Sequence, residues 1–291
     1  MAMIPDVLVV IGVGGMGAAI ARRLGAGRSV VLADRDEATT DALAASMVAE
    51  GYSVACQHVD VSDRSSVQEL VDFARNHGPV SAVAHTAGVS PTSATPARIL
   101  SVDLVGTALI LDAFAAAIAP RGAGVVVASM AGTLLGTALG EETERLLAAL
   151  ASDQLLEVPA IKSLLDGDPD DPGTRAFAYA IAKRANQLRV KSAAIPWARR
   201  GARINSISPG VISTTMGRAE VGDAATGEAA SALVARSASQ RMGTATEIAA
   251  AAEFLLGANA SFITGTDLLV DGGAVAAASA ASSLTTMNGF I

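Results

Sequence analysis

The segment Val7-Leu8-Val9-Val10-Ile11-Gly12-Val13-Gly14-Gly15-Met16-Gly17 decides the fold. Its first five residues are valine, leucine or isoleucine, which is typical of a strand buried on both faces. The glycines that follow permit a tight turn, and Gly17–Leu24 continues as an alanine-rich helical pattern. A buried strand that passes through glycines into a helix predicts the first unit of a helix-covered parallel sheet.

Similar apolar runs recur along the chain and alternate with helical patterns. The predicted strands are Val7–Ile11, Ser29–Ala33, Ser53–Val59, Val80–Ala84, Gly124–Ala128, Arg203–Ser208 and Leu268–Val270. The predicted helices include Gly17–Leu24, Glu37–Glu50, Ser65–Asn76, Ile99–Ala117, Phe177–Arg199 and Thr246–Leu256. This alternation predicts the α/β class, as a Rossmann-type, doubly wound parallel sheet of about seven strands. No repeat or hydrophilic linker divides residues 1–291, so we expect a single domain.

Composition excludes several classes of partner. The chain of 291 residues is 51% hydrophobic and carries a net charge of -7, which gives no electrostatic reason to bind nucleic acid or an anionic membrane. The single Cys56 excludes an internal disulfide and fits a reducing compartment. The apolar N-terminus lacks a basic region and carries Asp6, so it does not read as a signal peptide. We expect a soluble, cytoplasmic protein with no metal site.

The glycine turn, residues 12–17, matches G-x-G-x-x-G between a strand and a helix, which predicts a dinucleotide site. Asp34 closes the second strand, about 20 residues further on, where a carboxylate can accept the ribose hydroxyls and repel a 2′-phosphate. This favours NAD over NADP, although Arg35 could pair with that phosphate and Asp34 could simply begin the next helix. Asp60 and Val61 end the third strand, where they could contact the adenine.

Three candidate catalytic residues follow the strands on the side where such sheets bind ligands. Ser129 stands where the run Val125–Ala128 ends. Tyr179 and Lys183 form Y-x-x-x-K within a predicted helix, and this spacing places both side chains on one helix face.

With these residues in place, the chain closely resembles the short-chain dehydrogenase/reductase family over nearly its whole length. The resemblance rests on motifs in a fixed order: the glycine turn, Asp60, Ala87-Gly88, Ser129-Met130-Ala131-Gly132, Tyr179-Ala180-Ile181-Ala182-Lys183, Asn205-Ser206-Ile207-Ser208-Pro209-Gly210, Thr214, Ile263-Thr264-Gly265 and Asp271-Gly272-Gly273.

The resemblance implies the role of each residue. Tyr179 would be the general acid or base, Lys183 would favour its phenolate and hold the nicotinamide ribose, and Ser129 would hydrogen-bond the substrate oxygen. It implies a homodimer or homotetramer. The implied cofactor contacts are Gly12, Gly14, Gly15, Met16, Gly17, Asp34, Arg35, Asp60, Val61, Ala87, Gly88, Tyr179, Lys183, Pro209, Gly210, Ile212 and Thr214.

The chain departs from the family pattern in three places. Its glycine turn is one residue tighter, and Thr86 replaces an Asn that makes a structural hydrogen bond. Asp103 aligns with the fourth catalytic residue of the family, an Asn that orders a water in a proton relay. Asp103 could order the same water while adding charge near Lys183, or it could be an ordinary helix residue.

The predicted pocket walls, Val89–Ile99 and Val211–Met242, are largely small and apolar, which favours an uncharged hydrophobic ketone or alcohol. Residues 133–175, between Ser129 and Tyr179, form an insertion relative to most of the family. In the place of this insertion the chain resembles the bacterial 3α-hydroxysteroid dehydrogenase/carbonyl reductases, so a steroid-like or alicyclic substrate is expected. Within it we predict helices at Glu141–Ala151 and Pro159–Leu165.

Most family members form one of their dimer contacts through the face of the two helices here expected at Ile99–Ala117 and Phe177–Arg199. We expect the insertion to narrow the pocket mouth and to obstruct or remake that contact. Association should then rely more on the region Thr246–Val270, and residues 274–291 would form a tail. Two other functions stay open: a non-catalytic NAD-binding regulator, and an epimerase or dehydratase of the same family, whose larger C-terminal domain this short tail does not provide.

Overall fold

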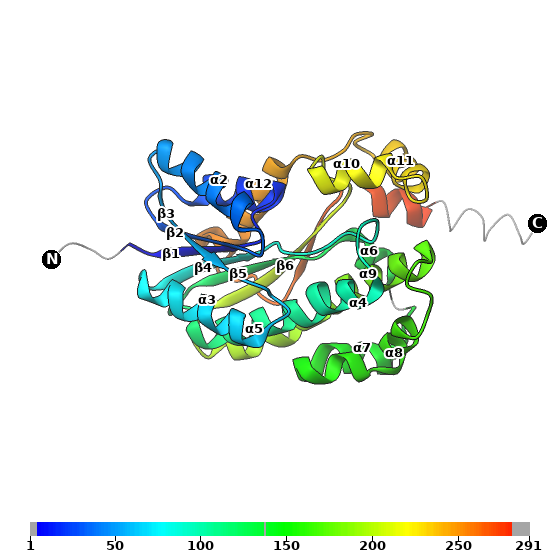
Figure 1. Cartoon of the computed structure of the whole chain (residues 1–291), viewed down its shortest axis with the longest axis horizontal. Coiled ribbons are helices and arrows are strands. Elements are labelled where there is room, and N and C mark those ends of the chain that lie inside the picture. The colour runs from blue at the N-terminus through cyan, green and yellow to red at the C-terminus, as the bar shows by residue number, and fades with distance from the viewer. Residues whose placement is uncertain (1–4, 137, 281–291) are drawn as a thin grey trace, which may run out of the picture.

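Seven parallel strands form one sheet at the centre of the computed structural model, which describes residues 5–136 and 138–280 (Figure 1). They are β1 (Val7–Ile11), β2 (Ser29–Asp34), β3 (Ser53–His58), β4 (Val80–His85), β5 (Ala123–Val127), β6 (Arg203–Pro209) and β7 (Asp267–Val270). Their order is β3-β2-β1-β4-β5-β6-β7, and every neighbouring pair is parallel. The predicted fold class is confirmed, and each predicted strand end lies within one residue of the observed one.

Helices cover both faces of the sheet (Figure 1). One face packs against α1 (Gly15–Leu24), α2 (Glu37–Ala49) and α12 (Ala245–Leu256). The other packs against α3 (Arg64–Asn76), α5 (Thr107–Ala117) and α9 (Pro172–Ala198). Every side chain of β1 is fully buried, because successive residues of a central strand point alternately into the two cores.

The predicted helix Ile99–Ala117 is interrupted. It consists of α4 (Pro96–Ile99), a π-helical segment η1 (Leu100–Gly106) and α5. Pro96–Ala117 is long and apolar enough to span a membrane, but 67% of its most apolar stretch of 18 residues is buried inside the protein. Val102, Leu109 and Phe114 pack in the core between sheet and helices, which makes this a core segment.

The insertion forms α6 (Met130–Leu135), α7 (Glu141–Ala149), a 3-10 helix η2 (Ser152–Glu157) and α8 (Pro159–Leu165). Both predicted helices are therefore present, the first ending at Ala149. Leu147 and Ile161 are fully buried in a third core that includes the face of α9 at Ile181. The α7 and α8 helices thus lie on the outer side of α4 and α9 (Figure 1).

Two arginines of α9 fix the insertion in place. The guanidinium of Arg189 is buried and donates to the carbonyls of Leu147 at 3.0 Å and Leu150 at 2.9 Å, which end α7. Arg184 binds Glu144 at 2.7 Å. Cations at the C-terminal end of a helix satisfy its free carbonyls and complement its dipole. Helix α7 is therefore held to α9 by charged contacts as well as by packing.

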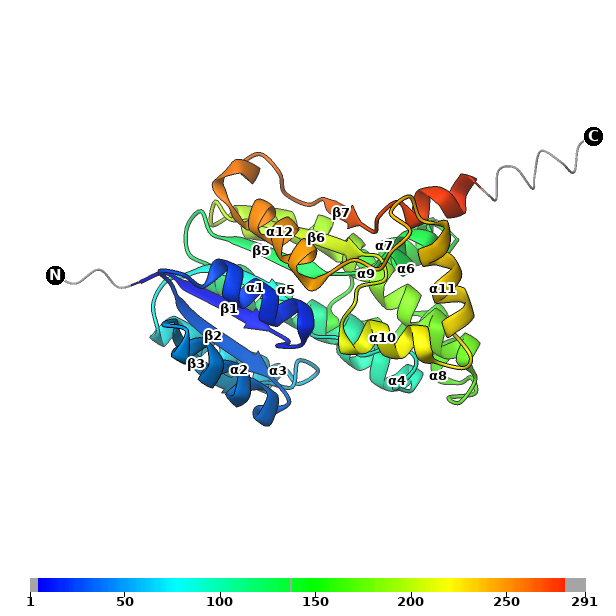
Figure 2. The same cartoon turned by 90° about the horizontal axis from the view of Figure 1, so that it is seen from above.

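Near the C-terminal ends of the strands lie α10 (Thr215–Gly222) and α11 (Gly227–Arg236), side by side (Figure 2). A short 3-10 helix, η3 (Ala258–Ala260), precedes β7. The predicted tail begins as a helix at residues 274–280, and its remainder, 281–291, lies outside the described residues.

Candidate active site

The glycine turn lies beside the point where the strand order reverses, between β1 and β4. Gly12 has φ +87°, and a side chain there would collide with the backbone of Ala87. A side chain at Gly17 would collide with the Gly12 carbonyl. The Thr86 hydroxyl donates to that carbonyl at 2.6 Å. Thr86 therefore makes a structural hydrogen bond at the position where the family pattern has an Asn. The turn is thereby closed onto the end of β4.

A first pocket opens in front of this turn. The predicted cofactor residues that line it are Gly12, Gly14, Gly15, Met16, Asp34, Arg35, Asp60, Val61, Ala87, Gly88 and Thr214. Gly17 lies outside the lining, where it lets α1 pack close to the turn. The pocket exposes three glycines of the turn and the first turn of α1, a combination that suits a pyrophosphate.

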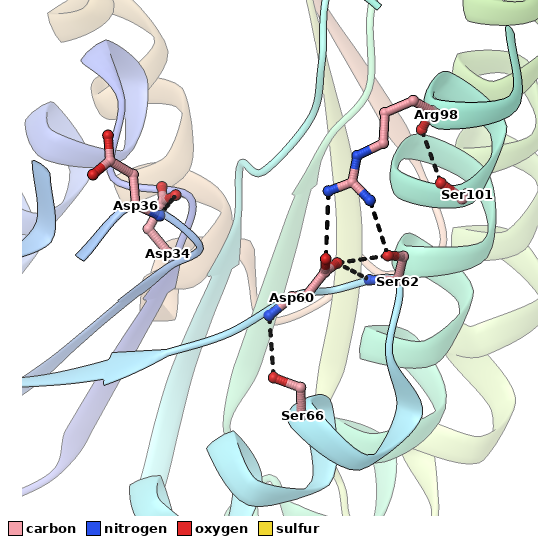
Figure 3. Close-up of polar contacts among 7 residues, drawn as sticks. All are labelled: Asp34, Asp36, Asp60, Ser62, Ser66, Arg98 and Ser101. Carbon is pink, nitrogen blue, oxygen red and sulfur yellow. Dashed lines mark hydrogen bonds and ion pairs between the residues drawn. The ribbon is translucent and has the colours of Figure 1, made fainter. Parts of the chain in front are cut away.

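Two carboxylates, those of Asp34 and Asp60, are among its lining residues (Figure 3). Asp34 accepts from Val13 N at 2.8 Å and from Asp36 N at 3.1 Å, which holds its carboxylate against the glycine turn. Asp60 accepts from Ser62 and lies 3.5 Å from the guanidinium of Arg98. Although burial opposes it, the hydrogen bonds from Ser62 and the charge of Arg98 hold the pKa of Asp60 below its usual range.

A second pocket adjoins the first through shared lining residues Met16, Thr214 and Met216. Ser129 and Tyr179 line it, together with the predicted cofactor residues Pro209, Gly210 and Ile212. Both predicted wall segments contribute, one through Pro91 and Thr92 and the other from Val211 to Leu233. The sequence therefore located this pocket correctly.

The position of the insertion relative to the second pocket differs from the prediction. Leu134 at its start lines the second pocket, but none of the described residues of α7, η2 and α8 does. The expectation that these helices narrow the pocket mouth is wrong. Their leucines pack instead on an apolar face of α9 at Ile181 and Ala185, in a core against which Tyr179 also packs.

Lys183 and Asp103 form a buried ion pair behind Tyr179. Lys183 Nζ lies 3.3 Å from Asp103 Oδ2, and their side chains are 6% and 0% exposed. Asp103 Oδ1 also accepts from Val89 N at 2.8 Å. Burial opposes the charge on Lys183, but the neighbouring Asp103 carboxylate raises the pKa of the ammonium above its usual value. Asp103 is therefore a partner of Lys183 and not an ordinary helix residue.

Gly88 permits this arrangement. A Cβ atom there would lie 3.2 Å from Lys183 Nζ and 3.3 Å from both Asp103 carboxylate oxygens. A side chain at this position would press on both charged groups and force them to shift by a few tenths of an ångström. Gly88 thus serves the ion pair as well as the first pocket.

Tyr179 stands between Lys183 and the second pocket, with Lys183 Nζ 5.4 Å from its ring centre. Burial raises the pKa of the phenol. The charge of Lys183 and a hydrogen bond with Ser129 lower it in part, whereas the charges of Asp103 and Glu220 raise it further. A positive charge beside the phenol, such as that of the Lys183 ammonium, favours its ionised form.

Sequence reasoning missed several polar residues here. His85 is buried and burial, with the charge of Lys183, lowers its pKa to about 3, so it is neutral. Its Nε2 lies 3.1 Å from the hydroxyl of Thr107, which donates to the Asp103 carbonyl at 2.9 Å. Arg98 in the first pocket and Glu220 in the second were missed as well. His85 ends β4, and Arg98 and Glu220 lie in α4 and α10, whose approach to the site no local sequence pattern signals.

Comparison with known proteins agrees with this geometry. A family model described as short chain dehydrogenase matches residues 6–139, and one described as enoyl-(acyl carrier protein) reductase matches residues 172–275. The short-chain dehydrogenase/reductase bsc3 of Alternaria brassicicola is 40% identical over 94% of this chain and 97% of its own. The chain belongs to the short-chain dehydrogenase/reductase family.

Two further members of the family are similar to it. The 3-alpha-hydroxysteroid dehydrogenase/carbonyl reductase of Comamonas testosteroni is 28% identical over 64% of this chain and 69% of its own. A 3-alpha-hydroxysteroid dehydrogenase from Pseudomonas sp. B-0831, solved with NADH, is 28% identical over 92% of this chain and 96% of its own, with a TM-score of 0.73. The resemblance drawn from the motifs is therefore confirmed, and the chain is an oxidoreductase of the class that acts on alcohols and ketones.

The Asp103–Lys183 pair yields a testable pH dependence. The Asp103→Asn change removes a negative charge beside Lys183 and Tyr179. The pKa at which Lys183 and Tyr179 together lose a proton should therefore fall, whichever of the two groups holds it. We expect the acid limb of kcat/KM for alcohol oxidation to move to lower pH. Exposed Asp72→Asn, which keeps the site charge, should leave the profile in place. An unchanged or upward-shifted limb in Asp103→Asn would contradict the role given to the pair.

Proposed function

We propose that the chain is an NAD(H)-dependent dehydrogenase/reductase that interconverts secondary alcohols and ketones, with Tyr179 as general acid or base. The observation that carries this proposal is the position of Tyr179 and Ser129 in a pocket that adjoins the glycine-lined pocket, with Lys183 behind the phenol. The bound nicotinamide would supply or accept the hydride.

The remaining steps belong to the chain's own residues. The Ser129 hydroxyl would hydrogen-bond the substrate oxygen, and the Tyr179 phenol would give or take its proton. Lys183 would stabilise the phenolate, and Asp103 would keep Lys183 charged. The adjoining pockets hold substrate and cofactor in contact, which is what direct hydride transfer requires. We further propose that the chain works as one domain, 1–291, in the cytoplasm.

The role of Tyr179 can be tested with Tyr52, the only other tyrosine in the sequence, as the control. Tyr179→Phe should lower kcat about 10²- to 10⁴-fold, the usual contribution of a proton-transfer group, because it loses the phenolic oxygen. Its affinity for NADH, measured by fluorescence, should stay within a few fold of wild type. Tyr52→Phe removes a hydroxyl that bonds Arg22 on the far side of α1, and it should change neither.

Other outcomes of this experiment separate the alternatives. Turnover by Tyr179→Phe comparable to wild type would refute the assignment. Tight NADH binding by wild type without turnover of any secondary alcohol or ketone would favour the non-catalytic regulator. Product formed with no net change in NADH would favour the epimerase or dehydratase.

For the cofactor we propose NAD over NADP, because Asp34 lines the first pocket with its carboxylate fixed by two backbone N–H groups. Repulsion of a phosphate about 4 Å away is about 1 kcal/mol in water and larger when partly buried. Arg35 in the same pocket acts in the opposite direction.

Asp34→Asn tests this choice, since it removes the charge and keeps an oxygen to accept from Val13 N. The ratio of kcat/KM for NAD to that for NADP should fall about tenfold, which corresponds to about 1.4 kcal/mol. Asp36→Asn, on the same loop but outside the pocket, should leave the ratio unchanged. Equal use of both cofactors by wild type would show that Arg35 dominates.

For the substrate we propose a bulky, largely apolar alcohol or ketone of steroid-like or alicyclic shape. The supporting observation is the second pocket, whose walls are mostly alanine, leucine, valine, isoleucine, methionine and proline. The two 3-alpha-hydroxysteroid dehydrogenases among the similar proteins support the same class.

We also propose that the chain forms a homodimer or homotetramer through the region Thr246–Val270. Phe262 is fully exposed and Phe254 is 44% exposed within this region, whereas α7 and α8 cover much of the α9 face. Exposed aromatic side chains of this size are typical of interfaces.

Two single substitutions distinguish the surfaces. Phe262→Asp should reduce the particle size measured by sedimentation, because a carboxylate at the interface would lose its water. Ile195→Asp, on α9 at a residue that is 70% exposed, should leave the size unchanged. The opposite pair of results would place the contact on the α9 face.

A further inference from the structure

Glu220 of α10 lies in the wall of the second pocket, where the sequence predicted an apolar surface. Among the described residues that line this pocket it is the only carboxylate, and there is no Lys, Arg or His. Its charge interacts with both Tyr179 and Lys183, so it lies within electrostatic reach of the reacting group. A carboxylate placed there affects what the pocket can bind.

The side chain of Glu220 is held in place from one side. Its Oε1 accepts from the Ser90 hydroxyl at 2.9 Å, and Ser90 is 3% exposed. The hydroxyl of Thr92 lies 3.0 Å from that of Ser90. Because Ser90 has one hydroxyl proton and directs it to Glu220, Thr92 donates to Ser90 in turn. This chain of hydroxyls joins the β4–α4 loop to α10 across the pocket.

The second oxygen of Glu220 is left to the pocket. No described side chain or backbone N–H donates to Oε2, and the one charged group that acts on Glu220 is Lys183. Burial raises the pKa of Glu220, and the Ser90 hydrogen bond and Lys183 offset this in part. Oε2 is not enclosed by the protein and is open to a ligand in the pocket, and a ligand group that donates to it gains a charge-assisted hydrogen bond.

We propose that Glu220 is a specificity residue that accepts a hydrogen bond from a second hydroxyl of the substrate, remote from the carbinol at Tyr179. The substrate class is then a mainly apolar alcohol or ketone with a further hydroxyl group. A hydroxyl fits better than an ammonium group because the surrounding wall is apolar and would strip a full charge of its water. This inference rests on the proposed function, because it places the substrate in the second pocket.

The test compares matched substrates. Cyclohexane-1,3-diol and cyclohexane-1,4-diol are each compared with cyclohexanol in wild type, Glu220→Gln and Glu220→Leu. A hydrogen bond to a charged group is worth about 1.5 to 3 kcal/mol, so wild type should prefer at least one diol by tenfold or more in kcat/KM. Glu220→Leu should abolish this preference, and Glu220→Gln, which keeps a neutral acceptor, should retain part of it.

The controls separate this inference from the proposed function. Glu228→Gln, an exposed residue of α11 outside the pocket, should keep the wild-type ratio. Melting temperatures and NADH affinity of each variant check folding and the first pocket. If wild type oxidises cyclohexanol and the diols equally well, or if Glu220→Leu keeps the preference, the inference is wrong while the proposed function stands.

Two further outcomes are also decisive. A stronger preference for 4-aminocyclohexanol than for either diol would show that Glu220 selects an ammonium group and not a hydroxyl. This result would overturn the proposal as stated. If wild type binds NADH but oxidises none of these alcohols and reduces none of the corresponding ketones, the proposed function fails and the inference fails with it.

Discussion

The buried ammonium of Lys183 is the interaction on which the arrangement of the site depends. Burying a cation at this depth is unfavourable, and this chain offsets the cost with a carboxylate where the family pattern has a neutral Asn. Asp103 provides the carboxylate from the π-helical segment η1, and Gly88 provides the space at the end of β4. Three elements that are distant in sequence are thereby fixed around one charge, with Tyr179 at its open side.

The sheet and the first pocket could be predicted from sequence because their signals are local. The central strands are short runs of buried residues, and the glycines at 12 and 17 are required by the backbone itself, one by its positive φ and the other by close packing. Ser129 could be placed at the ligand-binding edge because it follows a strand of a parallel sheet, and the Y-x-x-x-K spacing placed Tyr179 and Lys183 on one helix face. The resemblance to the family then joined the three residues in one site. The roles given to these residues stay predictions until they are measured.

The remainder depends on contacts between distant segments, which a single sequence does not encode in any pattern. The sequence left Asp103 undecided, because only the folded chain shows that η1 turns it towards Lys183. Glu220 escaped notice for the same reason: α10 contains both exposed and pocket-lining residues, and only its packing separates them. The apolar stripe of α7 indicated that this helix is packed, but not which of two apolar surfaces receives it.

The contacts of Arg184 and Arg189 with α7 have a consequence for anyone who wishes to engineer this protein. The insertion looks like a dispensable decoration on a minimal scaffold, yet the same helix carries the catalytic pair on one face and its anchoring arginines on another. Trimming the loop would leave a buried guanidinium without acceptors and bare the leucine-rich surface of α9 to water. Transplanting substrate loops between relatives is therefore safer around α10 than around α7.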